Sequence, residues 1–417
     1  MPNINTASFR RWDYVKITVL GFATTALWQS LHGVILPQRL LDFVPEAQKN
    51  TYLGILTLCG LLLAMFVQPI AGAVSDRSSF KWGRRRPYIL WGIIIAILLL
   101  PGIALAGTFA AIFIVYCLLQ VTANTAQGPY QAFVPELAPP DKRGVASGVK
   151  SLFELAGGVT FVLIAGYCYT KESGIGGLWV VLGALGFVLL VTMLATVLFV
   201  REPAVPVVKQ RVSPLAAISS VIKTDAWKNH NFIWFLVSRL LFYMAFTTIQ
   251  QFAFYYLQDV VGVADPSAAT SNFIAIAAGG MLVVVWPAGY LSDKIGRKLL
   301  TAISGVLGAL GIAVIALYHE YNTILWAAGI IGVAKGIFDS TNWALAVDFA
   351  TKNEEARYLG IANMATAGGA ALARVIGPAI DFFNSRSALS GYNFMLIMCI
   401  VYFIAGGALV FGVRRRA

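Results

Sequence analysis

Four amide side chains recur along one apolar stretch of the sequence at spacings of four, three and four residues: Gln120, Asn124, Gln127 and Gln131. In a helix this spacing places all four on one face. Amides both donate and accept hydrogen bonds, so such a face inside a membrane is suited to the hydroxyl groups of a polyol. The alternative is packing between helices, for which membrane proteins also use polar side chains.

Three further apolar stretches carry polar and aromatic residues at helical spacing. The first has Thr25 with Trp28, Gln29 and His32, the second has Arg239, Tyr243, Thr247 and Gln250, and the third has Lys335, Asp339, Asn342 and Trp343. Tryptophan rings can stack on the apolar faces of sugars, and His32 titrates near neutral pH unless it serves as a neutral hydrogen-bonding group. The predicted substrate-binding residues are Trp28, Gln29, His32, Gln120, Asn124, Gln127, Tyr243, Gln250, Asn342 and Trp343.

Charged residues inside apolar stretches are a second sign of function. A charge at mid-bilayer costs about 2.5–3.5 kcal/mol on insertion scales. Lys150 with Glu154, and Lys335 with Asp339, stand four residues apart, so each pair shares a helix face. Each pair either neutralises itself as a structural element or provides a carboxylate for a coupling ion, H⁺ or Na⁺.

Two further cations, Arg239 and Arg374, leave these stretches with an excess of positive charge. An anionic substrate such as a uronide, a carboxylate or a sugar phosphate would neutralise that excess. The alternative is that Arg239 extends to the cytoplasmic surface and Arg374 pairs with Asp381.

The elements that hold these residues must be membrane helices. The chain has 417 residues, 58% of them hydrophobic and only 12% charged, whereas soluble domains have about 25% charged residues. Apolar stretches long enough to cross a bilayer recur at about 15–37, 51–74, 88–107, 109–134, 145–169, 178–200, 232–257, 269–291, 299–318, 323–347, 359–381 and 392–413. The sequence therefore predicts an all-α integral membrane protein with twelve transmembrane helices in the lipid bilayer.

The distribution of basic residues predicts the orientation. Of 31 lysines and arginines, 23 fall in segments that are cytoplasmic if the N-terminus is cytoplasmic, and four fall in outer loops: Arg39, Lys49, Lys171 and Arg386. This bias predicts a multi-pass protein of the plasma membrane with both termini in the cytoplasm. The expected organisation is a six-helix bundle over residues 1–200, a cytoplasmic loop over 201–231 and a second six-helix bundle over 232–417.

The two halves repeat a motif, which predicts parallel halves. Gly72-Ala-Val-Ser-Asp76-Arg77 precedes Gly83-Arg84-Arg85-Arg86, and Gly289-Tyr-Leu-Ser-Asp293-Lys294 precedes Gly296-Arg297-Lys298. This doubled pattern resembles the signature loop of the major facilitator superfamily. The resemblance implies substrate binding between rocking halves and a cytoplasmic gate formed by Asp76, Arg77, Arg84, Arg85, Glu136, Arg143, Asp293, Lys294, Arg297, Asp348 and Arg357.

Residues 24–158 have a narrower resemblance. The run from Val67-Gln68-Pro69 to Gly83-Arg84-Arg85-Arg86-Pro87, with Asn124-Thr125-Ala126-Gln127-Gly128-Pro129, is similar to plant sucrose transporters and the related glycoside–pentoside–hexuronide cation symporters. In the sucrose transporters an aspartate accepts the proton at the position that corresponds to Gln120, and an arginine corresponds to Gln131. The resemblance therefore implies a sugar substrate, although this chain lacks the two charged side chains of the sucrose transporters.

Other classes of protein are excluded or disfavoured by composition and motifs. The sequence contains neither a phosphate-binding Gly-x-x-x-x-Gly-Lys-Ser/Thr loop nor a metal-binding His-Glu-x-x-His pattern. We expect no enzyme activity, cofactor, metal or nucleic-acid partner, and a monomer. The favoured function is cation-coupled symport of a sugar or glycoside by alternating access. Alternatives are transport of an organic anion, an efflux antiporter, and a non-transporting sensor or assembly factor on the same fold.

Overall fold

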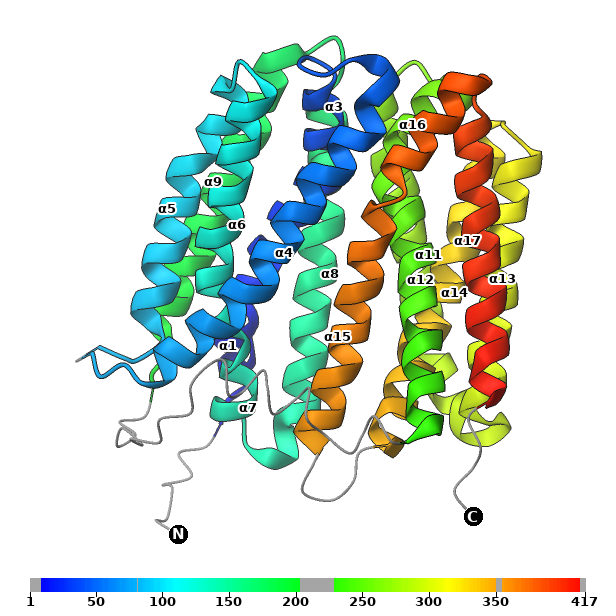
Figure 1. Ribbon diagram of the computed structural model, residues 1–417. Coiled ribbons are helices and arrows are strands. Elements are labelled where there is room, and N and C mark those ends of the chain that lie inside the picture. Colours follow the sequence, from blue (N-terminus) through cyan, green and yellow to red (C-terminus); the bar gives the residue numbers. More distant parts are fainter. Residues whose placement is uncertain (1–8, 81, 203–228, 350–354, 413–417) are drawn as a thin grey trace. The chain divides into compact units, whose positions relative to one another are not determined.

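The computed structural model describes residues 9–80, 82–202, 229–349 and 355–412 (Figure 1). Within these ranges all regular elements are helices. Twelve helical stretches in the described part of the chain are long and apolar enough to cross a membrane. They run Arg11–Leu40, Glu46–Asp76, Arg86–Leu105, Phe109–Leu137, Pro140–Cys168, Gly174–Phe199, His230–Val261, Pro266–Ser292, Arg297–Leu317, Tyr321–Phe349, Tyr358–Arg386 and Ser390–Gly412. The predicted fold class is confirmed.

The first six stretches are made of nine α-helices, long or short, and three single turns. They are α1 Arg11–Thr18, α2 Leu20–Ser30, η1 Leu31–Ile35, α3 Leu36–Leu40, η2 Glu46–Gln48, α4 Lys49–Asp76, α5 Arg86–Leu105, α6 Phe109–Gln131, α7 Phe133–Leu137, η3 Pro140–Lys142, α8 Arg143–Cys168 and α9 Gly174–Phe199. The next described helix is α11, so the expected cytoplasmic loop lies almost wholly outside the described residues.

The last six stretches contain the two longest helices of the described residues, α12 and α14. The elements of these six stretches are α11 His230–Tyr256, η5 Leu257–Val261, α12 Pro266–Ile295, α13 Arg297–Leu317, α14 Tyr321–Phe349, α15 Glu355–Arg374, α16 Gly377–Arg386, α17 Ser390–Leu409 and η6 Val410–Gly412. The start of α12 shows how the local sequence sets a boundary. The Asp265 carboxylate accepts from the backbone N–H groups of Ser267 (3.0 Å) and Ala268 (3.2 Å), and Pro266 occupies the first turn, where a missing N–H costs nothing.

Two transmembrane stretches contain an irregular turn beside a polar side chain. In the first, Leu31–Ile35 form a π-helical turn that ends two residues before Pro37, which cannot donate a backbone hydrogen bond. In the eleventh, α15 ends at Arg374, and α16 begins at Gly377 with Pro378 in its first turn. The change of direction between α15 and α16 is visible in Figure 1. Both interruptions place polar side chains, His32 and Arg374, beside irregular backbone.

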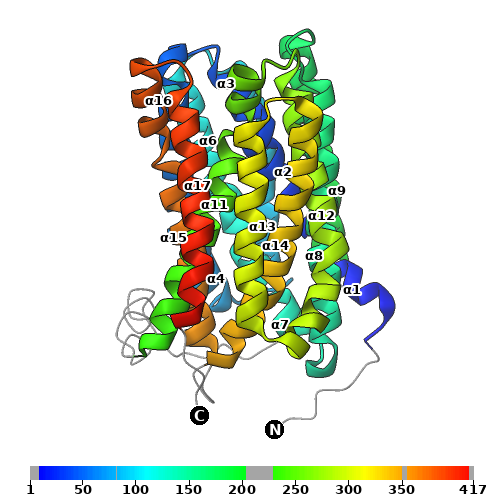
Figure 2. The same cartoon turned by 90° about the vertical axis from the view of Figure 1, so that its right-hand side faces the viewer.

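By internal contacts the chain divides into two compact units. The first contains the described residues of Met1–Leu31 and Cys59–Pro214, and the second contains those of His32–Leu58 and Leu215–Ala417. In the first unit α2 lies against α8, and α5 lies against α6 and α9. In the second, α13 lies beside α14 and α17, and α11 lies beside α15 and α17 (Figure 2).

Close helix contacts in both units depend on glycine. A Cβ at Gly157 of α8 would lie 2.0 Å from the carbonyl oxygen of Phe22, and one at Gly332 of α14 would lie 1.9 Å from that of Ala277. Small residues at these positions let the backbones approach, so van der Waals packing can hold helices together where lipid removes the hydrophobic driving force.

Candidate functional site

The first unit brings four of the predicted gate residues together around Arg85. The Arg85 side chain is only 3% exposed. Its Nη2 donates to Asp76 Oδ1 at 2.6 Å and to Glu136 Oε1, and its Nε donates to Glu136 Oε2 at 3.0 Å. Arg84 adds an ion pair with Glu136 at 2.8 Å. Asp76 ends α4 and Glu136 lies in α7, so this charge network joins the ends of α4, α5 and α7.

Glu202, which the sequence analysis did not single out, belongs to the same end of the unit. Its carboxylate accepts from the backbone N–H groups of Arg84 (2.9 Å), Arg85 (3.0 Å) and Arg86 (3.0 Å). These groups surround the start of α5, where a negative charge complements the helix dipole. Gly83 has φ +128°, and a Cβ there would lie 2.8 Å from a Glu202 oxygen, so glycine fits this turn.

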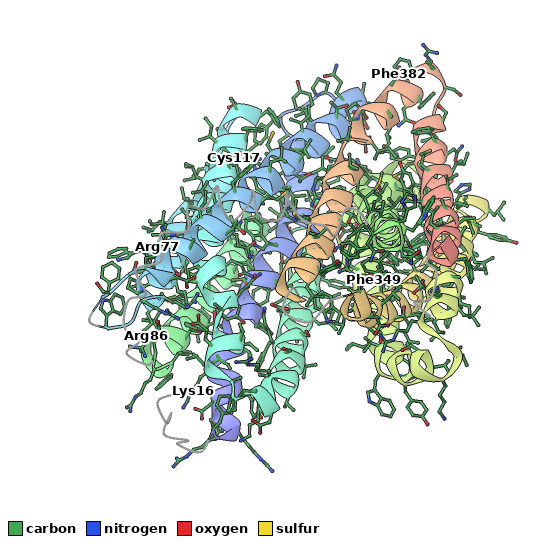
Figure 3. The ribbon with its side chains drawn as sticks, turned by 60° about the horizontal axis from the view of Figure 1, so that its bottom comes forward. Lys16, Arg77, Arg86, Cys117, Phe349 and Phe382 are labelled. Carbon is green, nitrogen blue, oxygen red and sulfur yellow. The ribbon has the colours of Figure 1, made fainter. Side chains whose placement is uncertain are left out.

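The other two predicted gate residues of the first unit are Arg77 and Arg143. Arg77 is exposed on the turn that follows α4, and Arg143 donates from Nε to the Ala138 carbonyl at 3.3 Å. Figure 3 labels Arg77 and Arg86 at this end of the unit, with Lys16 of α1.

The second unit has a smaller counterpart of the Arg85 network. Arg297, at the start of α13, forms an ion pair with Asp348 and donates to the Ala344 carbonyl at 2.8 Å, both near the end of α14. The Lys294 ammonium lies 4.5 Å from the centre of the Tyr290 ring. The side chains of Asp293 and Arg357, which complete the predicted gate, lie outside the described residues.

The amide stripe of α6 is largely satisfied within its own helix. Gln120 donates from Nε2 to the Tyr116 hydroxyl at 2.7 Å, and Asn124 donates from Nδ2 to Gln120 Oε1 at 3.0 Å. The Trp28 ring meets Tyr116 edge to face, with 6.5 Å between ring centres. Asn124 and Gln120 thus form a chain of hydrogen bonds that ends on the Tyr116 hydroxyl, and the Tyr116 ring contacts Trp28.

Gln127, one turn further along the stripe, is different. Its Oε1 is a buried acceptor for which the described residues provide no donor. A buried acceptor without a donor costs about 1–3 kcal/mol, so a ligand that donates a hydrogen bond to Gln127 would remove this cost.

Gln29, a predicted substrate-binding residue of α2, lies against α8, since a Cβ at Gly158 would lie 3.0 Å from the Gln29 side chain.

Both predicted ion pairs form, but their geometry differs. Lys150 and Glu154 are 3.6 Å apart, and both side chains are partly exposed. Lys335 donates to Asp339 Oδ2 at 2.6 Å, while the Tyr243 hydroxyl donates to Asp339 Oδ1 at 3.0 Å. Asp339 is therefore held through both oxygens, whereas Glu154 makes one longer contact with its cation.

Arg239 does not extend to the surface, contrary to one alternative above. It is 4% exposed. Its Nε donates to the Ala362 carbonyl (3.1 Å) and Thr366 Oγ1 (2.8 Å) of α15, and its Nη1 donates to Asn342 Oδ1 of α14. The guanidinium carbon lies 5.4 Å from the Tyr243 ring centre and 5.8 Å from that of Trp343. Arg239, Tyr243, Lys335, Asp339, Asn342, Trp343 and Thr366 are called the α11–α14–α15 cluster below.

His32 lies in the π-helical turn and Arg374 at the end of α15. Within the second unit the two side chains are close enough to interact electrostatically. Gln250 is half-buried on α11, two turns beyond Tyr243. Asp381, which one alternative above pairs with Arg374, accepts from groups at the start of α4. Asp381 accepts from Asn50 Nδ2 at 2.8 Å, from the backbone N–H of Thr51 at 2.7 Å and from Thr51 Oγ1 at 2.6 Å.

The start of α4 contributes a further polar group that sequence reasoning missed. Lys49, assigned above to an outer loop, is 2% exposed and lies 2.6 Å from Asp259 of η5. The Tyr392 hydroxyl of α17 donates to the other oxygen of Asp259 at 2.6 Å. Lys49, Asn50, Thr51, Asp259, Asp381 and Tyr392 are called the α4-start cluster below.

Twelve membrane-spanning helices with paired basic loops and buried polar clusters define a polytopic protein of the transporter class. The family model described as Major Facilitator Superfamily matches residues 17–374 and 273–416, so the chain belongs to the major facilitator superfamily. It is 33% identical over 132 residues to the sucrose transport protein SUC3 of Arabidopsis thaliana, covering 26% of this chain and 22% of the relative. It is also 33% identical over 103 residues to the minor myo-inositol transporter IolF of Bacillus subtilis, covering 25% and 22%.

These curated relatives are therefore matched over about a quarter of this chain and less than a quarter of their own length. Solved structures match over nearly the whole of this chain. A bacterial homologue of the lysosomal transporter Spinster has a TM-score of 0.75 at 15% identity, with 97% of each chain covered. The nucleoside transporter NupG has a TM-score of 0.74 at 17% identity, with 97% of this chain and 99% of that chain covered. At these identities the likeness supports the fold alone.

Proposed function

We propose that this protein is a secondary transporter that moves a sugar-like solute across the plasma membrane by alternating access, driven by a cation gradient, with both termini in the cytoplasm. The observation that carries the proposal is the presence, in membrane-spanning helices, of polar groups that hydrogen-bond polyols next to aromatic rings. Trp28, Tyr116 and the α6 amides of Gln120, Asn124 and Gln127 supply these groups in the first unit, and the α11–α14–α15 cluster supplies them in the second.

The relatives support the solute class. The matched segments belong to proteins named as transporters of sucrose and myo-inositol, both rich in hydroxyl groups. The orientation is supported by the excess of lysine and arginine in the segments proposed to be cytoplasmic.

Gln127 provides the test of solute binding, in purified protein reconstituted into liposomes with disaccharides, glycosides and inositols as solutes. We expect Gln127→Ala to raise the half-saturating concentration about fivefold, because the net value of one hydrogen bond is about 1 kcal/mol. Gln131→Ala is the matched control, since the same residue type lies at the exposed end of α6. Equal affinities for wild type and Gln127→Ala would remove this face from the site, and no uptake of any polyol would refute the solute class.

For coupling we propose Glu154 rather than Asp339, because Asp339 is held by two donors and Glu154 by one distant cation. A coupling carboxylate has to exchange its ion during each cycle, which favours the less constrained group. We expect Glu154→Gln to lose the stimulation of uptake by an H⁺ or Na⁺ gradient, while exchange of labelled for unlabelled solute continues. Glu172→Gln, an exposed acid that follows α8, is the control. Persisting gradient stimulation in Glu154→Gln would contradict the assignment.

A further inference from the structure

The α11–α14–α15 cluster contains a buried cation whose hydrogen bonds all end on neutral groups. Arg239 donates to a carbonyl, a hydroxyl and an amide oxygen. In the part of the chain that the structure describes, no carboxylate oxygen lies within ion-pair distance of Arg239. A buried charge is costly unless an opposite charge offsets it, and within a membrane such groups usually serve a function.

The other charges of the cluster cancel. Asp339 does interact electrostatically with Arg239, but its two oxygens are bound by Lys335 Nζ at 2.6 Å and the Tyr243 hydroxyl at 3.0 Å. Lys335 and Asp339 thus form a closed pair with no net charge. The cluster as a whole carries one positive charge, which resides on Arg239.

An independent observation points to a missing hydrogen-bond acceptor at the same place. Asn342 is fully buried, and its Nδ2 has no acceptor among the described residues. Its orientation is fixed, because the Arg239 donor requires the amide oxygen to face it, and a flipped amide would set donor against donor. A buried amide donor without an acceptor carries a desolvation cost that a ligand oxygen would remove.

We infer that the transported solute carries a carboxylate, and that this carboxylate binds Arg239 and Asn342 Nδ2. The inference rests on the proposed transport function and specifies its substrate class: a polyhydroxy monocarboxylate of sugar size. One carboxylate matches the single net charge of the cluster, whereas a phosphate monoester carries about −1.5 to −2 at pH 7. A carboxylate can also accept two parallel hydrogen bonds from a guanidinium.

The aromatic side chains of the cluster fit this role. The Tyr243 and Trp343 rings lie 5.4 and 5.8 Å from the guanidinium carbon and restrict where it can point. Trp343 is 44% exposed, so part of its ring remains available to the apolar face of a sugar. The same cluster thereby combines a fixed cation, an unused amide donor and an aromatic surface.

The test uses pairs of solutes in which one member has a carboxylate where the other has a hydroxymethyl group. Glucose and glucuronate are one pair, sorbitol and gluconate a second, and the methyl ester of glucuronate is a neutral analogue of the acid. Binding is measured without transport, as ligand-induced thermal stabilisation of the purified wild-type protein in detergent. We expect at least one of the acids to bind at least tenfold more tightly than its neutral partner, and the ester to bind like glucose. Equal binding within both pairs, or no stabilisation by either acid, would overturn the inference.

A variant then connects the preference to the site. Arg239→Gln is expected to bring the affinities for acid and neutral solute to within about twofold, whereas Arg239→Lys retains part of the preference because it keeps the charge. Arg386→Gln, the same substitution at an exposed arginine of α16, should keep the preference. Retained preference in a folded Arg239→Gln protein would overturn the assignment.

The two proposals fail in different ways. Stabilisation by an acid without uptake under any gradient would leave the carboxylate site intact and contradict transport. Uptake of neutral polyols with no preference for acids would confirm transport and refute the carboxylate site.

Discussion

Replacing Arg85 with alanine is expected to reduce transport at least about tenfold. The substitution removes the cation shared by Asp76 and Glu136, and hydrogen bonds to charged groups are worth about 1.5–3 kcal/mol each. A shift of 1.4 kcal/mol already changes the balance between two conformations about tenfold. The measurement is initial uptake into liposomes, normalised to the amount of folded protein by size-exclusion chromatography.

Arg86→Ala is the matched control for this substitution. Arg86 lies next to Arg85, and its Nη1 donates to the Trp82 carbonyl rather than to the Asp76 and Glu136 carboxylates. Arg85→Lys should recover only part of the rate, because an ammonium cannot reproduce the two-pronged contact with Glu136. Equal rates for Arg85→Ala and Arg86→Ala would show that the Arg85 network does not contribute to the transport cycle.

Asp76→Ala tests the same network from its exposed side. The Asp76 carboxylate is about half exposed, and Arg85 retains its hydrogen bonds with Glu136 when Asp76 is replaced. We therefore expect a smaller loss of transport from Asp76→Ala than from Arg85→Ala, although the repeated sequence motif draws attention to the aspartate first.

The membrane-spanning helices could be predicted from the sequence because their signal is local. The stretch expected at 109–134 is observed as α6 Phe109–Gln131 with α7, and the one expected at 145–169 is α8 Arg143–Cys168. The break between α15 and α16 was missed because hydropathy does not register it. Pro378 was the available signal, since a proline in a helix cannot donate its backbone hydrogen bond and clashes with the carbonyl four residues earlier, here that of Arg374, where α15 ends.

The same distinction between local and long-range contacts decides which parts of the site could be predicted from the sequence. Lys335 and Asp339 meet because residues four apart on a helix are neighbours. Glu202 contacts backbone groups 116 to 118 residues away, and Lys49 reaches Asp259 across 210 residues. No spacing rule connects such residues, so only the folded chain reveals them. Lys49 was misassigned because a buried cation at a helix start resembles a loop residue in composition.

The α4-start cluster supports the second large prediction, which concerns the end of the second unit proposed to face the exterior. Asp381→Ala removes a carboxylate that accepts from Asn50 and twice from Thr51. Hydrogen bonds to charged groups are worth about 1.5–3 kcal/mol each. We expect the start of α4 to separate from α16 more often, which favours the outward-open conformation. A cysteine in place of the fully buried Thr57, six residues along α4 from Thr51, reports this separation.

The label is a membrane-impermeant thiol reagent added from outside, in a chain whose four native cysteines are replaced by serine. Thr57→Cys is expected to react at least about tenfold faster in the Asp381→Ala background. Each 1.4 kcal/mol by which the closed conformation is destabilised raises the population of the open conformation about tenfold. Glu46→Ala is the control, since Glu46 is 82% exposed and lies 3.8 Å from Lys49, and exposed pairs contribute about 0–1 kcal/mol. Unchanged labelling with Asp381→Ala would mean that the α4-start cluster stabilises the second unit in every conformation and does not open during transport.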